Sequence, residues 1–317
     1  MHILINLSIF LTYTLIILGG LVHNTGSGLS CPDWPLCYGQ VISTGASQGA
    51  FLEQLHRFLA SSIGFLTLAV FWMGRAHKET HNKFYKYTLG CFFLVLLQGG
   101  LGASTFFYKL PTLISTTQLC ISLVCLCSLI PRRSEYCSSV LKKGFSIDST
   151  RFKSLFDPTL KDGIFFSVLA VSIQIFLGAV LSHSGAGKVC GAGEFFLQCV
   201  HFESHEVLYW SAIPKVQLNL AHKYFAIVTL VTVAWNCSKI FFSSGKWDGV
   251  CDKYKNSLKI NSVFITAIIL LQAFSGSLVS KTSVSVVPTT AHLAIGSLLI
   301  CLLWNLRNKL KYSELES

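Results

Sequence analysis

The sequence predicts an all-α membrane protein with eight transmembrane helices, arranged as two pseudo-two-fold-related four-helix bundles. Of its 317 residues, 52% are hydrophobic and only 12% are charged, whereas about 25% of an ordinary soluble domain is charged. One span needs ~20 apolar residues, so this composition suffices for eight spans and excludes a soluble globule. The four-span pattern also occurs twice along the chain, which predicts two homologous halves.

Hydrophobic runs of near-span length place the eight helices. The runs cover residues 4–22, 52–74, 85–106, 112–130, 163–181, 216–238, 260–280 and 286–304. The first run has no Lys or Arg before it and no small-residue cleavage site after it, so we expect a retained helix rather than a removed signal peptide.

The net charge of +11 is unevenly divided among the loops. Nineteen of the 25 Lys and Arg residues follow the even-numbered spans. The positive-inside rule therefore predicts that both termini are cytoplasmic and that the loops after the odd-numbered spans face outward. The basic charge reflects topology in the lipid bilayer, and nucleic acid is not an expected partner. Because no transit peptide precedes the first span, we expect a multi-pass protein of the bacterial cytoplasmic (inner) membrane.

Four of the twelve cysteines lie in the predicted outward loops. An oxidising compartment would pair them, most simply Cys31 with Cys37 and Cys190 with Cys199. The other eight lie in spans or on the cytoplasmic side, where small apolar packing is the favoured interpretation.

Three segments of the first half match segments of the second half, each without an internal gap. The matching pairs of segments are 18–31 with 177–190, 53–57 with 219–223, and 96–119 with 270–293. We therefore divide the chain into an N-terminal four-helix half (1–131), a basic cytoplasmic linker (132–160) and a C-terminal four-helix half (161–317). Since each half has an even number of spans, the axis relating them should run along the membrane normal.

Three histidines occupy repeat-related positions. His56, His222 and His292 each fall within the first two turns of an even-numbered span, and Gln118 occupies the fourth position. A single such histidine is as often a hydrogen-bonded interfacial side chain, but three at one depth favour ligands. Neutral imidazole binds iron or copper well, and two on facing helices can clamp a flat macrocycle. His222 and His292 therefore predict a bis-histidine haem b in the second half.

The first half differs at two of these positions. An amide such as Gln118 is a poor iron ligand, so iron held by His56 would retain a labile sixth position. Glu53 lies one turn before His56, where the second half has only Asn219. Glu53 is a candidate to accept or relay protons, and the alternative is helix-dipole complementarity. We expect chemistry in the first half and electron storage in the second.

Basic residues follow two of the histidines. Arg57 and Lys223 are adjacent to His56 and His222. They are candidates to pair with haem propionates, although snorkelling to lipid headgroups is equally ordinary for such side chains.

These residues resemble the haem A synthase family from about residue 4 to 306. The resemblance is carried by the loop from Thr25-Gly26-Ser27-Gly28 to Cys31-Pro32-Asp33-Trp34-Pro35-Leu36-Cys37, by Glu53-x-x-His56-Arg57, by Leu97-Gln98 with Gly102, and by Thr290-x-His292-Leu293. It implies eight helices in two bundles and oxidation of a ring methyl of haem O to the formyl group of haem A, for cytochrome oxidase. A haem O synthase and an electron acceptor are the expected partners, and a homo-oligomer is compatible with this reading.

The resemblance also implies residue roles. His222 and His292 match the ligands of a haem b cofactor, His56 a ligand in the substrate half, and Glu53 the acidic catalytic residue. Cys31 and Cys37 match a redox-active outer pair. Gln118 departs from the family's usual histidine, which allows either a five-coordinate site or a weakened enzyme; we expect activity to survive.

Two other function classes compete with this prediction. One is a di-haem b-type electron-transfer cytochrome that leaves haem unaltered, and the other is a transporter of haem or a small solute. A transporter has no need for ligands at one depth with a carboxylate in only one half, so it ranks last. The identity of the bound porphyrin separates the enzyme from the cytochrome.

Overall fold

A computed structural model describes most of the chain. The described residues are 2–41, 47–76, 82–141, 158–191, 199–201, 207–208, 213–243 and 252–315.

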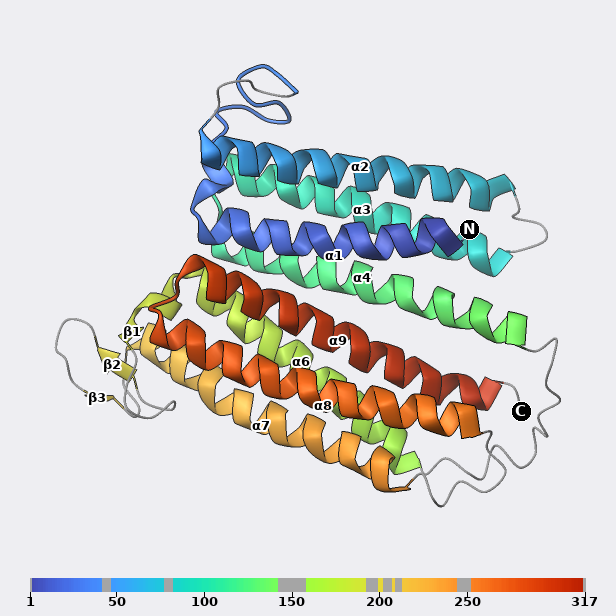
Figure 1. Cartoon of the computed structure of the whole chain (residues 1–317). Helices are drawn as coiled ribbons and strands as arrows, with labels where there is room; N and C mark the ends of the chain where they lie inside the picture. Colours follow the sequence, from blue (N-terminus) through green and yellow to red (C-terminus); the bar gives the residue numbers. More distant parts are fainter. Residues whose placement is uncertain are drawn as a thin grey trace. The chain divides into compact units, whose positions relative to one another are not determined.

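Eight long helices dominate the described residues, and all eight are long and apolar enough to cross a membrane. They are α1 (His2–Asn24), α2 (Gln48–Ala76), α3 (Asn82–Phe107), α4 (Thr112–Leu141), α6 (Pro158–His183), α7 (Pro214–Ser243), α8 (Asp252–Lys281) and α9 (Val286–Leu315) (Figure 1). The predicted all-α class with eight membrane spans is confirmed. Many large apolar side chains on the helices are exposed, among them Phe65 and Trp72, as expected of surfaces that face lipid.

The chain divides into two compact units, residues 1–129 and 130–317. In the second unit α7 and α9 each contact both α6 and α8, so the four helices form a closed ring. In the first unit α2 contacts α1 and α3. Side-chain hydrogen bonds connect α3 to α4: Gln98 Nε2 donates to the carbonyl of Gln118 (3.1 Å), and the Tyr87 hydroxyl donates to that of Ser128 (2.8 Å).

The first helix of each unit ends in the same local structure. A glycine with a positive φ of 70°, Gly26 after α1 and Gly185 after α6, precedes a short 3₁₀ helix. These 3₁₀ helices are η1 (Ser27–Leu29) and η2 (Ala186–Lys188). Glycine has no Cβ and accepts this left-handed conformation without strain. The shared turn supports a duplicated origin.

Three short antiparallel strands follow η2 in the order β1-β2-β3. They are β1 (Cys190–Gly191), β2 (Cys199–His201) and β3 (Val207–Leu208). Cys190 pairs with His201, and Cys199 pairs with Leu208. These strands lie in the loop between α6 and α7, and Cys190 of β1 is buried against Val216 and Leu220 of α7.

Most helix ends lie beyond the expected boundaries, and α2 and α4 are two examples. Helix α2 begins at Gln48 rather than at residue 52, and only the first of the four added residues is polar. Helix α4 continues through Pro131 to Leu141, so the first ten residues of the segment expected as linker are helical. Proline removes one backbone hydrogen bond but keeps a helical φ, so the helix is not obliged to end there.

Candidate functional site

The two histidines of the second unit come from diagonal helices of the ring. His222 is the ninth residue of α7 and His292 the seventh residue of α9. The two side chains are close enough to interact electrostatically. Since α7 and α9 are separated by α6 and α8, the imidazoles approach each other across the interior of the bundle. His222 and His56 lie in the third turn of their helices, slightly deeper than the expected first two turns, because α7 and α2 begin earlier than their apolar runs.

Each histidine packs against a glycine of the preceding helix. A Cβ added at Gly178 would lie 2.9 Å from Cε1 of His222, and one at Gly276 would lie 3.0 Å from Cε1 of His292. The first unit repeats this contact, since a Cβ at Gly19 would lie 3.0 Å from Cε1 of His56. The glycines therefore form notches that only a residue without a side chain can provide.

A glutamine lies one helical turn before each glycine notch of the second unit. Gln174 Nε2 lies 3.2 and 3.3 Å from the two ring nitrogens of His222 and also donates to the carbonyl of His222 (3.1 Å). Gln272 Nε2 lies 3.2 Å from Nε2 of His292. The Oε1 atoms of both glutamines are buried without a hydrogen-bond partner. Polar groups thus gather around the imidazoles in an otherwise apolar bundle.

The first unit presents a different pair of side chains. His56 lies in the Gly19 notch, and its Nδ1 is buried without a hydrogen-bond partner. Gln118 occupies the corresponding position on α4, where a Cβ on Gly102 would be 3.4 Å from its Nε2. No glutamine precedes the Gly19 notch, because residue 15 is a leucine.

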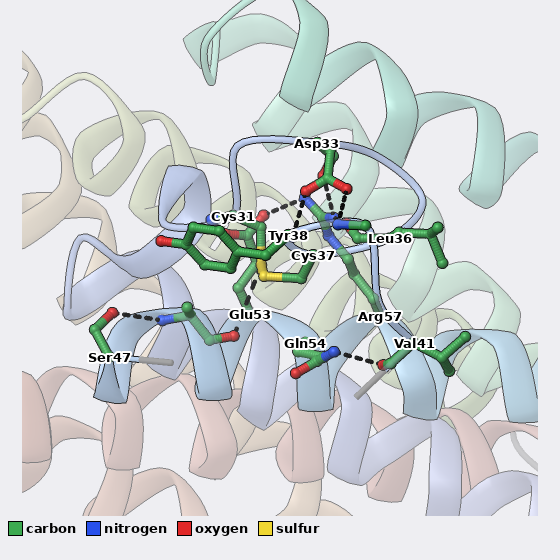
Figure 2. Close-up of a disulfide and its surroundings, with 12 residues drawn as sticks. Cys31, Asp33, Leu36, Cys37, Tyr38, Val41, Ser47, Glu53, Gln54 and Arg57 are labelled. Carbon is green, nitrogen blue, oxygen red and sulfur yellow. Dashed lines mark hydrogen bonds and ion pairs between the residues drawn. A yellow bond between two sulfur atoms is a disulfide. The ribbon is translucent and has the colours of Figure 1, made fainter. Parts of the chain in front are cut away.

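Glu53 and Arg57 attach α2 to the loop that follows η1. One carboxylate oxygen of Glu53, Oε2, accepts the backbone N–H of Cys31 at 2.8 Å, and the other pairs with Arg57 Nη2. Arg57 Nη1 donates to the carbonyl oxygens of Asp33 (2.7 Å) and Leu36 (2.6 Å). Figure 2 shows the guanidinium reaching from α2 into the loop.

That loop is closed by a disulfide between Cys31 and Cys37 (Figure 2). Both sulfurs are buried against Ala50 of α2. Within the loop, the carboxylate of Asp33 accepts the backbone N–H groups of Tyr38 (2.6 Å) and Gly39 (2.7 Å). The predicted Cys31–Cys37 pair is confirmed, and it lies directly beside Glu53.

The second unit has no carboxylate at the equivalent position. Asn219 donates from Nδ2 to the carbonyl of Ala186 in η2 at 3.4 Å, a weaker contact than that of Glu53. Lys223 is buried and in contact with other groups of the protein. Cys190 is disulfide-bonded. The side chain of Cys199 lies outside the described residues, so the pairing of Cys190 with Cys199 stays a prediction.

One pattern around the site was missed in the sequence. Glutamine stands four residues before glycine three times, at Gln98 and Gly102, Gln174 and Gly178, and Gln272 and Gly276. Residues four apart share one face of a helix, so each pair meets a single residue of the next helix. The spacing is visible in the sequence, but the residues that these pairs contact, Gln118, His222 and His292, follow only from the pairing of the helices.

Comparison with known proteins places the chain in a family. Residues 2–304 match the family model COX15-CtaA, described as cytochrome oxidase assembly protein. The chain belongs to this family. Among curated relatives are three proteins named heme A synthase. The protein from Exiguobacterium sibiricum is 28% identical over 58% of this chain, and the match covers 60% of the relative. The protein from Shouchella clausii is 29% identical over 55% of this chain, and the match covers 56% of the relative. The third, from Symbiobacterium thermophilum, is 27% identical over 54% of this chain and covers 56% of the relative. The matched segment thus spans little more than half of each relative.

Proposed function

We propose that this protein is a haem A synthase, which oxidises a ring methyl of haem O to the formyl group of haem A. The observation that carries this proposal is the asymmetry between the units. The second unit offers two histidines across a closed four-helix ring, whereas the first offers one histidine, an amide and a buried carboxylate. A duplicated protein with two equivalent electron-transfer sites would not require a carboxylate and an amide in only one unit.

The second unit fits a haem b. Two imidazoles on facing helices of a bundle can clamp a flat macrocycle, and the buried Oε1 atoms of Gln174 and Gln272 have no hydrogen-bond partner, so they could bond a further polar group. His222 and His292 would hold the iron, and Lys223 is a candidate partner for a propionate. Such a group supplies reversible one-electron transfer.

The first unit is the proposed substrate site. His56, whose Nδ1 lacks a partner, would hold the haem O substrate, and Gln118 leaves the opposite side weakly ligated. The Cys31 amide and Arg57 fix the orientation of the Glu53 carboxylate, so Glu53 is oriented to accept a proton as the methyl group is oxidised. Because Arg57 is already bonded to Glu53 and to two loop carbonyls, its pairing with a propionate is a secondary proposal.

The remaining parts of the proposal concern surroundings. We infer that the protein lies in a bacterial cytoplasmic membrane with both termini in the cytoplasm, which places the Cys31–Cys37 disulfide in the oxidising outer compartment. A haem O synthase supplying the substrate, an electron acceptor and a homo-oligomeric assembly complete the proposed context.

The test is the chemical identity of the bound pigment. Full-length protein is expressed in cells that make haem O. Its bound pigments are extracted and separated by chromatography, and their masses are determined by mass spectrometry. Porphyrin that carries a farnesyl tail and a hydroxymethyl or formyl group is expected. If the protein contains only protohaem, and cells lacking it still make haem A, the proposal is wrong and the di-haem cytochrome is favoured.

A further inference from the structure

Ser275 lies against the histidine of α9. Its hydroxyl oxygen is 2.9 Å from Nδ1 of His292 and also donates to the carbonyl of Gln272 at 2.9 Å. The side chain is 6% exposed, so water does not compete for these bonds. Ser275 belongs to α8, the helix whose Gly276 forms the notch for the same imidazole.

The number of hydrogens decides the direction of the bond to the ring. A serine hydroxyl has one hydrogen and two lone pairs. Since that hydrogen is donated to the Gln272 carbonyl, Oγ is an acceptor toward Nδ1, and Nδ1 must carry the ring proton. On the other side of the ring, the amide of Gln272 donates to Nε2 at 3.2 Å, which requires a lone pair on Nε2. Both contacts specify the same tautomer.

We propose that Ser275 is a positioning residue that holds His292 as the Nδ1–H tautomer and so presents the Nε2 lone pair for iron. This inference rests on the proposed haem b site. An acceptor on the distal N–H of a ligating histidine fixes the ring orientation and makes the ligand more basic. The Gln272 amide donates a hydrogen bond to Nε2 of His292, and iron binding at Nε2 would replace this bond.

Ser275 also makes the two ligands of this site unequal. The residue immediately before each of the corresponding glycines, Gly19, Gly102 and Gly178, is a leucine. His222 therefore has no hydroxyl at the corresponding place, and Gln174 Nε2 lies at nearly equal distances from both of its ring nitrogens. An atom at nearly equal distances from the two ring nitrogens lies along the in-plane direction of neither, so Gln174 Nε2 does not select one tautomer of His222. The stronger electron donor to the iron is thus His292.

The experiment compares full-length protein, purified with the haem it retains, with Ser275→Ala. Loss of the acceptor makes His292 a weaker base, which stabilises ferric iron less. We expect the haem midpoint potential in a spectroelectrochemical titration to rise. Haem transfer to an excess of a haem-scavenging protein should accelerate by about 10- to 100-fold, the usual effect of losing such a partner.

Two further variants separate this role from general packing. Ser277→Ala removes a similar hydroxyl from the same helix, one that donates to the Phe274 carbonyl at 2.8 Å, and should leave potential and haem retention unchanged. Ser275→Thr keeps the hydroxyl and should restore both. Unchanged values in Ser275→Ala, or equal changes in Ser277→Ala, overturn the inference alone. Wild-type protein that retains no haem overturns the proposed function and this inference with it.

Discussion

At the residue scale, Glu53 has a structural role in the loop and a proposed chemical role, and the two are separable. One oxygen of its carboxylate holds the Cys31 amide, and the other faces Arg57. A carboxylate with a buried hydrogen bond to the backbone stabilises the loop whether or not it also takes part in chemistry. Substitutions that preserve shape but remove charge distinguish these roles.

Glu53→Gln tests the chemical role. Glutamine keeps an oxygen for the Cys31 amide but cannot take up a proton as carboxylate does. We expect an intact Cys31–Cys37 disulfide, retained haem b, and haem A formation reduced by about 100-fold or more. The comparison is Gln54→Ala, which removes a neighbouring bond from α2 to the carbonyl of Val41 in the same loop and should leave haem A formation nearly unchanged. Normal product yield from Glu53→Gln would remove this residue from the mechanism.

Gln118 tests how strongly the first unit must hold its substrate. If oxidation requires an accessible position more than a second strong ligand, Gln118→Ala should retain haem A formation within about threefold, less than 1 kcal/mol of activation free energy. Gln118→His should also remain active. Loss of product in Gln118→His together with full activity in Gln118→Ala would show that ligand replacement is the wrong description of this position.

The sequence offered candidate side chains more readily than their partners. Chemistry and repeat position were enough to select His56 and Glu53 as candidates and to predict the Cys31–Cys37 disulfide, which the structure contains. The bonds of Arg57 to carbonyls 24 and 21 residues away do not follow from either, since they depend on how the disulfide loop folds over α2. The contact of Ser275 with His292 on α9 could not be predicted, because nothing in the sequence distinguishes this serine from the other serines of the membrane helices.

At the element scale, close packing of helices is set by glycines. The Gly19, Gly178 and Gly276 notches each receive the Cε1 edge of an imidazole. Small residues let helices approach closely in membranes, and here they also fix where a ring can lie. Helix positions could be predicted from hydropathy, but their ends could not, since α4, for example, continues through polar residues beyond its apolar run.

Gly178→Ala tests this packing. The new Cβ would lie 2.9 Å from Cε1 of His222, closer than real contacts allow, so the ring must move at a cost of about 1–3 kcal/mol. We expect loss of most of the haem b, measured by the pyridine haemochrome method. Gly100→Ala in α3, where a Cβ meets nothing within 4 Å, should keep its haem and gain up to ~1 kcal/mol in helix propensity. Equal haem contents in the two variants would contradict the claim that Gly178 fixes the position of the His222 ring.

At the scale of the whole molecule, duplication explains why similar loops, notches and ligand positions occur in both units. The differences between the units, at Glu53 and Asn219 and at Gln118 and His292, are the basis of the proposal that the units have separate tasks. Hydropathy was enough to predict the eight apolar helices, and the pseudo-two-fold relation of the two halves stays a prediction. Sequence periodicity alone does not determine how the four helices of each unit pair.

The orientation of the whole molecule is also testable. Loops rich in Lys and Arg are expected in the cytoplasm. A reporter that is active only outside the cytoplasmic membrane should therefore be inactive when fused after Leu315 and active when inserted after Val41. The reverse result would invert the topology and place the disulfide in a reducing compartment.

The central claim is that His222 and His292 jointly hold one porphyrin iron in the second unit. The most direct test is electron paramagnetic resonance with Soret absorbance on purified full-length protein, its His222→Ala and His292→Ala variants, and His56→Ala. The account predicts a low-spin bis-histidine signal that either second-unit variant abolishes and His56→Ala preserves. A wild-type protein without Soret absorbance, or a low-spin signal that survives both second-unit substitutions, would contradict it.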